Sequence, residues 1–301
     1  MILEVKDITK NFGEKSVLKG ISFSAQSGEA LGLLGRNGAG KTTTIRIIMQ
    51  LFPPNSGEVL VDGKPLSIRE INVGYMPEER GLYPKKKIME QLIYFAELKG
   101  VSKDVAIERA NKLLDRLQMT EYKDAKLETL SKGNQQKIQL VTTLISNPDI
   151  VILDEPFSGL DPVNAMLLKD VVRELIADGK IVIFSSHQMN YIEEFCNNIV
   201  IINGGQIAVS GAIKDIKRSY TKNLVLIESD DNEAVKTALA SIDFVKDATQ
   251  IDSGIKVELL DGYDIKNLMS ELSKLDVLVS GISLYEPSLS EIFVDYTEVE
   301  S

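Results

Sequence analysis

One stretch near the N-terminus has residue types and a spacing that can bind the phosphates of a nucleotide. Residues 35–42 are Gly-Arg-Asn-Gly-Ala-Gly-Lys-Thr, which fits the pattern G-x-x-x-x-G-K-[ST]. Glycines let the backbone curl so that successive N–H groups converge on phosphate oxygens. In this pattern the Lys41 ammonium reaches the β- and γ-phosphates, and the Thr42 hydroxyl binds Mg²⁺. The stretch therefore predicts nucleotide binding.

The segments on either side of this loop are the ones that such a site needs. Residues 29–34 form a short, mostly apolar segment typical of a strand, and residues 43–49 have the character of a buried helix. A helix N-terminus adds a partial positive charge close to the phosphates. A chance glycine-rich turn is the alternative interpretation, and the flanking strand and helix argue against it.

Two carboxylates follow a second apolar segment. Residues 150–153 are Ile-Val-Ile-Leu, which indicates a strand buried on both faces, and Asp154 and Glu155 come directly after it. Two adjacent acids at the edge of a buried sheet need a partner, and Mg²⁺ beside a phosphate loop is a suitable one. We expect Asp154 to hold the hydrated metal and Glu155 to polarise the attacking water. A purely structural pair is the alternative.

The single histidine of the chain, His187, ends another apolar segment, residues 180–184 with two serines after it. A lone histidine is often structural. This one ends a strand at the same expected edge of the sheet as Asp154, so we expect it to contact the γ-phosphate.

A further acidic pair, Glu78 and Glu79, follows the expected strand at residues 72–77. Open parallel sheets place ligand-binding residues at this end of their strands. On residue types alone, a solvated charged turn explains the pair equally well.

Two more positions could contact a nucleotide. Phe12 lies at the expected turn 12–15, where its ring could stack on adenine, although it could also be a hydrophobic residue at a strand end. Ser131 is a suitable N-cap for a helix that starts there, and a helix start is an anion site. Because the first loop already serves its own phosphates, this second site suggests a nucleotide held between two molecules. An ordinary capped helix is the alternative.

The elements that must position these residues follow from periodicity. Residues 1–25 alternate apolar and polar positions, as antiparallel strands do, and residues 88–119 have helical periodicity interrupted at Gly100. Residues 219–301 indicate the order βαββαβ, with strands expected at 223–229, 245–252, 255–260 and 277–285, helices at 232–242 and 265–275, and a last helix opened by a capping box at Ser288–Glu291.

Composition sets the broad class. The chain has 301 residues, with 44 % hydrophobic and 26 % charged residues, as expected for about two globular domains. No apolar run approaches the roughly 20 residues that span a bilayer, and the N-terminus has no signal-peptide pattern. Cys196 is the single cysteine, which excludes an internal disulfide and is most simply a small buried residue. These features predict a cytosolic protein.

Charge is unevenly distributed along the chain. Residues 219–301 contain 6 lysines and no arginine against 17 acidic residues, a net charge of −11, whereas residues 1–218 carry 28 basic and 27 acidic residues. A near-neutral part followed by an acidic part predicts two domains. It also argues against nucleic acid as a partner, because such a surface needs a basic stripe.

With these motifs in place, residues 1–218 resemble the ATP-binding subunits of ABC transporters. Phe12 falls at the family's adenine-stacking aromatic, and residues 35–42 match Walker A. Residues 130–134 (Leu-Ser-Lys-Gly-Asn) stand in place of the signature Leu-Ser-Gly-Gly-Gln. Further along the chain, residues 150–155 match Walker B, residues 158–161 match the D-loop, and His187 matches the switch histidine. The resemblance is specific because these separate motifs keep the family's order and spacing.

The resemblance implies an α/β fold with a P-loop NTPase core over residues 1–218. That core would have an antiparallel β subdomain and a helical subdomain at about residues 85–145. The acidic residues 219–301 would form a small α+β, ferredoxin-like accessory domain. Similar appendages occur on prokaryotic exporters, including exporters of sodium and of drugs or antibiotics.

The resemblance also implies a function. The chain would bind ATP and Mg²⁺ and hydrolyse ATP to power export across the cell membrane through a separate permease subunit, at the cytoplasmic side. Two copies, or one copy and a paralogous ATPase subunit, would hold ATP head to tail. In this family the signature serine and glycine, here Ser131 and Gly133, bind the γ-phosphate of ATP on the opposite subunit.

The residues implied for each role form three sets. The catalytic residues are Glu155 and His187. The metal ligands are Thr42, Asp154 and Glu78. The nucleotide-binding residues are Phe12, Gly35, Arg36, Asn37, Gly38, Ala39, Gly40, Lys41, Thr42, Thr43, Ser131, Gly133 and Asp161.

The chain departs from the family pattern at two places. Glu78 stands at the Q-loop position, where most members have glutamine, and Lys132 and Asn134 replace glycine and glutamine in the signature. We expect activity to survive, because Ser131 and Gly133 remain. Two alternatives are a soluble ABC ATPase that acts on ribosomes or DNA and a regulatory module with impaired hydrolysis. The absence from this sequence of a second ATPase unit, long coiled-coil insertions and zinc ligands argues against the first.

Overall fold

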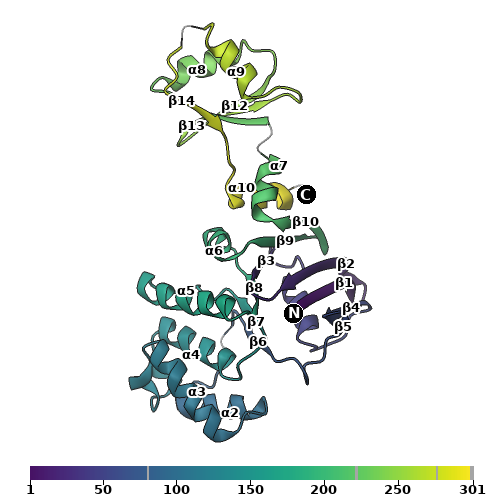
Figure 1. Cartoon of the computed structure of the whole chain (residues 1–301), viewed down its shortest axis with the longest axis vertical. Helices are drawn as coiled ribbons and strands as arrows, with labels where there is room; N and C mark the ends of the chain where they lie inside the picture. The colour runs from purple at the N-terminus through teal and green to yellow at the C-terminus, as the bar shows by residue number, and fades with distance from the viewer. Residues whose placement is uncertain (80, 221–222, 276, 299–301) are drawn as a thin grey trace. The chain divides into compact units, whose positions relative to one another are not determined.

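The computed structural model describes residues 1–79, 81–220, 223–275 and 277–298, which divide into two compact units (Figure 1). The first unit ends at Ser210, and the second runs from Gly211 to Glu298. The change in charge along the sequence placed this division at residue 219. The second unit therefore also takes in helix α7 (Ile213–Tyr220).

The first unit begins with an antiparallel sheet, which confirms the prediction from the alternating N-terminal residues. β1 (Ile2–Phe12) and β2 (Lys15–Gln26) pair across a turn in which Gly13 has a φ of +60°. β1 also pairs with β4 (Ser56–Val61), which in turn pairs with β5 (Lys64–Pro65). Apolar residues of this sheet are buried in the same core as the second sheet of the unit.

The second sheet carries the strands that position the expected site. Its order is β10-β9-β3-β8-β7-β6, and the pairs from β9 to β6 are all parallel. The strands are β3 (Ala30–Leu34), β6 (Val73–Met76), β7 (Ile150–Asp154), β8 (Ile181–Ser185), β9 (Asn198–Asn203) and β10 (Gln206–Ala212). Every residue of β3, β7 and β8 is buried, as expected for parallel strands covered on both faces.

Helices pack against both faces of this sheet. α1 (Lys41–Ile48) shares a core with the antiparallel sheet and with alternate residues of β3, β7 and β8. Alternate strand residues face opposite sides. On the other side, Phe184 of β8 stacks on Phe195 of α6 (Met189–Phe195), with ring centroids 5.6 Å apart. Cys196 follows α6 and is buried, and burial raises the pKa of its thiol.

The predicted helical block is confirmed. α2 (Ile88–Leu98), α3 (Lys103–Arg116) and α4 (Lys132–Leu144) lie side by side (Figure 1). Gly100, with a φ of +79°, separates the first two helices. Short 3₁₀ turns at Thr120–Tyr122 and Leu127–Thr129 connect α3 to α4, and α5 (Pro162–Ala177) follows β7. Across the described residues, none of the helices is long and apolar enough to cross a membrane.

The second unit is built around a four-stranded antiparallel sheet of order β12-β13-β11-β14. Its remaining elements, in chain order, are β11 (Leu224–Glu228), α8 (Asn232–Leu239), β12 (Val245–Ile251), β13 (Gly254–Leu259), α9 (Ile265–Leu272), β14 (Gly281–Leu284) and α10 (Leu289–Glu298). After α7, the elements follow the expected βαββαβ order. Buried residues of α8 and α9 pack against those of β11 and β13.

Element ends in this unit differ from expectation at several places. The helices α8 and α9 end at Leu239 and Leu272 rather than at residues 242 and 275. β14 begins at Gly281 rather than at residue 277, because its partner β11 ends at Glu228, the residue opposite Gly281. α10 continues past Phe293 to Glu298. The predicted capping box is confirmed: the Ser288 N–H donates to Glu291 Oε2 over 2.9 Å, and the Glu291 N–H donates to Ser288 Oγ over 3.2 Å.

Candidate functional site

The loop of residues 35–40 joins β3 to α1 and has a shape that only glycine can adopt at its key positions. Gly35, Gly38 and Gly40 have φ angles of +153°, +82° and +120°. A Cβ atom on Gly35 would collide with the Ile202 carbonyl oxygen, and one on Gly40 would lie 2.6 Å from a Leu18 methyl carbon. Gly40 is also the N-cap of α1. The backbone is therefore curled tightly in front of a helix N-terminus, as a phosphate loop requires.

The Lys41 side chain folds back over this loop. Its Nζ donates to the Gly35 carbonyl oxygen over 2.6 Å and to that of Arg36 over 3.3 Å. Burial lowers the pKa of the Lys41 ammonium, and the nearby carboxylates of Asp154, Glu155 and Glu78 oppose that shift. A cation thus lies at the loop where phosphate charge would be bound, and three predicted acidic residues lie near enough to act on its charge.

Asp154 and Glu155 are held at the end of β7, and both are buried, with 8 % and 6 % of their surface exposed. The Tyr75 hydroxyl donates to Asp154 Oδ2 over 3.3 Å, and burial together with the Asp154 charge raises the pKa of Tyr75. Burying a carboxylate is costly unless it is hydrogen-bonded or paired with a cation. Tyr75 and the charge of Lys41 supply those interactions for Asp154.

Glu155 is fixed by the residues that follow β8. The Ser186 hydroxyl donates to Glu155 Oε2 over 3.0 Å, and the His187 N–H donates to Oε1 over 2.8 Å. His187 Nδ1 lies 2.6 Å from the same Oε1, while the imidazole is largely exposed. Glu155 has a φ of +49°, a strained conformation for a residue other than glycine. The structure thus brings Glu155 and His187 together.

The donors at this edge of the sheet fit Mg²⁺. This cation prefers oxygen ligands, and proteins bind it through one or two carboxylates while phosphate and water supply the rest. Asp154 and Thr42 offer a carboxylate and a hydroxyl beside the loop, and Glu78 is an exposed carboxylate. Within the described ranges, no cluster of three or more His, Cys, Asp or Glu side chains could hold a metal without such added ligands.

The expected signature residues form a second cluster. Ser131 is the N-cap of α4, and its Oγ accepts from the Asn134 N–H over 3.3 Å, which confirms the predicted capped helix. Asp161 caps α5 and accepts from the Asn164 N–H over 2.9 Å, which lowers the pKa of Asp161. Gly133 packs against the Asn164 side chain, because a Cβ there would lie 3.3 Å from Asn164 Nδ2. Ser131 and Asp161 are both exposed.

Phe12 lies at the end of β1 and is 50 % exposed. Its ring meets that of Phe52 edge to face, with centroids 5.6 Å apart, and Lys10 Nζ lies over both rings. The residue is thus exposed enough to stack on a base, and it also has the contacts of a residue at a strand end.

Sequence reasoning missed four residues that hold the site in shape: Tyr75, Gln136, Gln139 and Ser186. Ser186 directly precedes His187, so its position could have suggested a role. The other three act through contacts between residues that are 19 to 79 positions apart. No local pattern marks such contacts.

The fold and the site together define a P-loop ATPase. A phosphate loop lies between the buried parallel strand β3 and a helix, and two buried acids lie at the end of β7, which is separated from β3 by β8 in the same sheet. Residues 18–158 match the family model described as "ABC transporter", and residues 211–297 match that of the "ATP-binding protein DrrA1-3-like, C-terminal domain".

Known proteins resemble this chain over most of its length. It is 40 % identical over 295 residues to the uncharacterized ABC transporter ATP-binding protein YhaQ of Bacillus subtilis, covering 98 % of each chain. It is 35 % identical over 214 residues to the Nod factor export ATP-binding protein I of Burkholderia lata, covering 70 % of each. A solved structure described as an ATP-binding subunit of an ABC transporter superposes with a TM-score of 0.68 at 31 % identity, covering 73 % of this chain and 93 % of that one.

The chain therefore belongs to the family of ATP-binding subunits of ABC transporters. It has the mixed α/β P-loop fold expected from the sequence, and it is an ATP-binding protein of the ABC ATPase class. Subunits of this class generally work with membrane permease subunits and form dimers.

Proposed function

We propose that this chain hydrolyses ATP to drive export of a substrate across the cell membrane through a separate permease subunit at the cytoplasmic side. A relative over 70 % of the chain is named for Nod factor export, which supports the direction of transport. The observation that carries the hydrolytic part is Glu155, a buried carboxylate that hydrogen bonds hold beside the phosphate loop.

The chemistry follows from the charges at the loop. Lys41 and the loop N–H groups would hold the β- and γ-phosphates, and Glu155 would accept a proton from water as the water oxygen bonds to the γ-phosphorus. The bond from that phosphorus to the bridging oxygen breaks, and ADP leaves. Asp154, Thr42 and Glu78 are the residues that would hold Mg²⁺, which neutralises phosphate charge. His187, already in contact with Glu155, would reach the γ-phosphate.

The site is proposed to be shared between two chains. Ser131, Gly133 and Asp161 form a cluster at the N-termini of α4 and α5, and the described contacts do not join its side chains to Lys41 or Glu155. An exposed helix N-terminus can bind anionic phosphate. In a head-to-tail dimer of identical chains, or of this chain with a paralogous ATPase subunit, Ser131 and Gly133 of one chain would bind the γ-phosphate on the other.

The substitution Glu155→Gln tests this account, because the amide keeps the size of the side chain and cannot accept the proton. We expect turnover to fall by roughly 10²-fold or more and a stable dimer to accumulate with ATP in size-exclusion chromatography. Glu97→Gln, at an exposed position on α2, is the matched control and should leave both readouts unchanged. Unchanged turnover in Glu155→Gln would contradict the assigned role.

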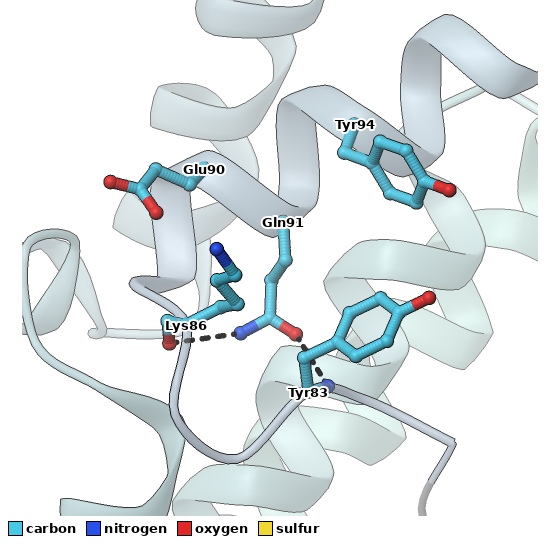
Figure 2. Close-up of a pocket in the computed structure, with 5 residues that line it drawn as sticks. All are labelled: Tyr83, Lys86, Glu90, Gln91 and Tyr94. Carbon is cyan, nitrogen blue, oxygen red and sulfur yellow. Dashed lines mark hydrogen bonds between the residues drawn. The ribbon is translucent and has the colours of Figure 1, made fainter.

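The permease is proposed to dock near residues 79–83, of which Arg80 lies outside the described residues, between the parallel sheet and the helical block. A pocket of about 330 Å³ lies beside this segment (Figure 2). Its wall includes the half-exposed rings of Tyr83 and Tyr94, with centroids 6.3 Å apart. Buried Gln91 fixes the pocket floor by accepting from the Tyr83 N–H over 3.2 Å. Lys86 and Glu90 complete the lining, and two aromatic rings beside a cation and a carboxylate suit insertion of a side chain from a partner.

Affinity purification of this chain from native membranes tests the partnership directly. We expect a multi-spanning membrane protein to be recovered with the chain, and Tyr83→Ala together with Tyr94→Ala to reduce that recovery. Leu260→Ala, an exposed apolar position in the second unit, serves as the control. Recovery of ribosomes or DNA instead of a membrane protein would overturn the proposal.

A further inference from the structure

One helix of the first unit donates side-chain hydrogen bonds to the backbone beside two acidic positions of the site. Gln136 and Gln139 of α4 are three residues apart and share a helix face. Gln136 Nε2 donates to the carbonyl oxygens of Glu155, over 3.4 Å, and Pro156, over 3.2 Å. Gln139 Nε2 donates to the carbonyl oxygens of Pro77, over 2.6 Å, and Glu79, over 3.3 Å.

Gln139 holds a segment that lies outside any helix or strand. Residues 77–79 follow β6, and the two carbonyl groups that Gln139 binds lie on either side of Glu78. One side-chain amide carries two N–H groups, so a single Gln139 can serve both carbonyls. The Gln139 side chain is 3 % exposed, whereas Glu78 is exposed. A buried, hydrogen-bonded amide therefore fixes the backbone from which the Glu78 carboxylate extends.

The same helix begins at the expected signature residues. Ser131 caps α4, and Gln139 lies two turns further along. Glu78 lies close enough to Lys41 for its charge to oppose the lowering of that ammonium's pKa. Gln139 thus connects the helix that begins at Ser131 to a carboxylate beside the phosphate loop.

We propose that Gln139 is a positioning residue for Glu78: its amide sets where the Glu78 carboxylate lies relative to Lys41 and ties that carboxylate to the helix that begins at Ser131. This inference rests on the proposed role of Glu78 at the nucleotide. Gln139 itself touches no reacting atom, and it acts through the two carbonyl groups that it binds.

A double-mutant cycle tests the proposal in the full-length chain. Gln139→Met keeps the length of the side chain and removes both N–H donors. We expect Gln139→Met to lower turnover and to raise the half-saturating Mg²⁺ concentration. The ratio of turnover to that concentration should fall by roughly tenfold, as it commonly does when an outer hydrogen-bond partner of a metal ligand is lost. In a Glu78→Ala background the same change should have no further effect on either quantity, because Gln139 would then have no carboxylate to position.

Two further measurements guard against a general loss of structure. Thr142→Val, which removes a hydroxyl on α4 that bonds only within the helix at Ile138, should leave turnover unchanged. Hydrogen exchange at the amides of Glu78 and Glu79 should be faster in Gln139→Met and not in Thr142→Val, and this readout remains available if turnover is lost.

Several results would overturn the proposal. One is that Gln139→Met lowers turnover equally with Glu78 present and with Glu78→Ala. Another is that Gln139→Met lowers turnover in neither background. A third is that hydrogen exchange at residues 78–79 does not change in Gln139→Met. Glu155→Gln separates this outcome from failure of the proposed function. If Glu155→Gln loses turnover and the effects of Gln139→Met and Glu78→Ala simply add, only the positioning role of Gln139 is rejected. If Glu155→Gln retains turnover, the proposed function is rejected.

Discussion

The acidic side chains of the two units differ in where they lie and in what holds them. In the first unit Asp154 and Glu155 are buried at the end of β7 and are held by Tyr75, Ser186 and the His187 backbone. In the second unit, whose net charge is more negative, no described Asp or Glu is buried. Several of its acids instead cap helices or pair with lysines at the surface.

The caps and pairs of the second unit show this use of charge. Asp264 accepts from two backbone N–H groups at the start of α9, which a capping box closes. Lys246 lies 2.6 Å from Glu258 with both side chains exposed, and such pairs contribute little stability. The comparison teaches that burial of charge at strand ends, and not the number of charges, marks a site able to do chemistry.

We expect the largest loss of turnover when a lysine of the first unit is replaced, and none when a lysine of the second unit is replaced. Lys41→Ala removes the cation at the phosphate loop, and we expect turnover to fall roughly 10²- to 10³-fold with weaker ATP binding by calorimetry. Lys246→Ala in the second unit removes only a surface pair and should leave both quantities unchanged. Comparable losses in the two variants would break the comparison.

The next largest effect is a loss of stability on replacing one glycine in each unit, at positions with similar backbone constraints. A Cβ atom at Gly35 would collide with the Ile202 carbonyl oxygen, and one at Gly254 with that of Ile227. Both glycines have positive φ, so Gly35→Ala and Gly254→Ala should each destabilise their unit by about 1–3 kcal/mol in urea unfolding. Only Gly35→Ala should also reduce ATP binding. Reduced ATP binding in Gly254→Ala, in chains still folded, would show that the second unit serves the site.

The smallest effect concerns the helix cap at Asp264. Asp264→Ala should lower the stability of the second unit by roughly 1 kcal/mol, seen as earlier unfolding of that unit in thermal denaturation. Turnover at a temperature where the chain stays folded should match that of the unsubstituted protein. A fall in turnover under those conditions would assign the second unit a part in catalysis.

Much of the fold could be predicted because its central strands are short apolar runs with clear ends. β3, β7 and β8 are buried on both faces, so no polar residue interrupts them. A glycine follows β3, two acids mark the end of β7, and two serines and a histidine mark the end of β8. The phosphate loop could be predicted for a similar reason, since its glycines are required by local backbone shape. β9 and β10 were not predicted.

The support of the site could not be predicted. Gln139 binds the segment around Glu78 across some 60 residues of sequence, and Tyr75 reaches Asp154 across 79. Such contacts depend on how β6, β7 and α4 pack, and neither periodicity nor composition encodes that packing. The same holds for the contact of His187 with Glu155. The residue pattern predicts that both lie at one edge of the sheet, but it does not predict that they touch.

We propose that each ATP site takes its phosphate loop from one chain and its signature residues from another. Mixing two inactive variants tests this arrangement. Lys41→Ala and Ser131→Ala should each be nearly inactive alone. In a mixed dimer one site joins an intact loop to an intact Ser131, so equal mixing with random exchange should restore about a quarter of normal turnover. Turnover that stays at the level of the separate variants, in mixtures shown to exchange subunits, would contradict a shared site.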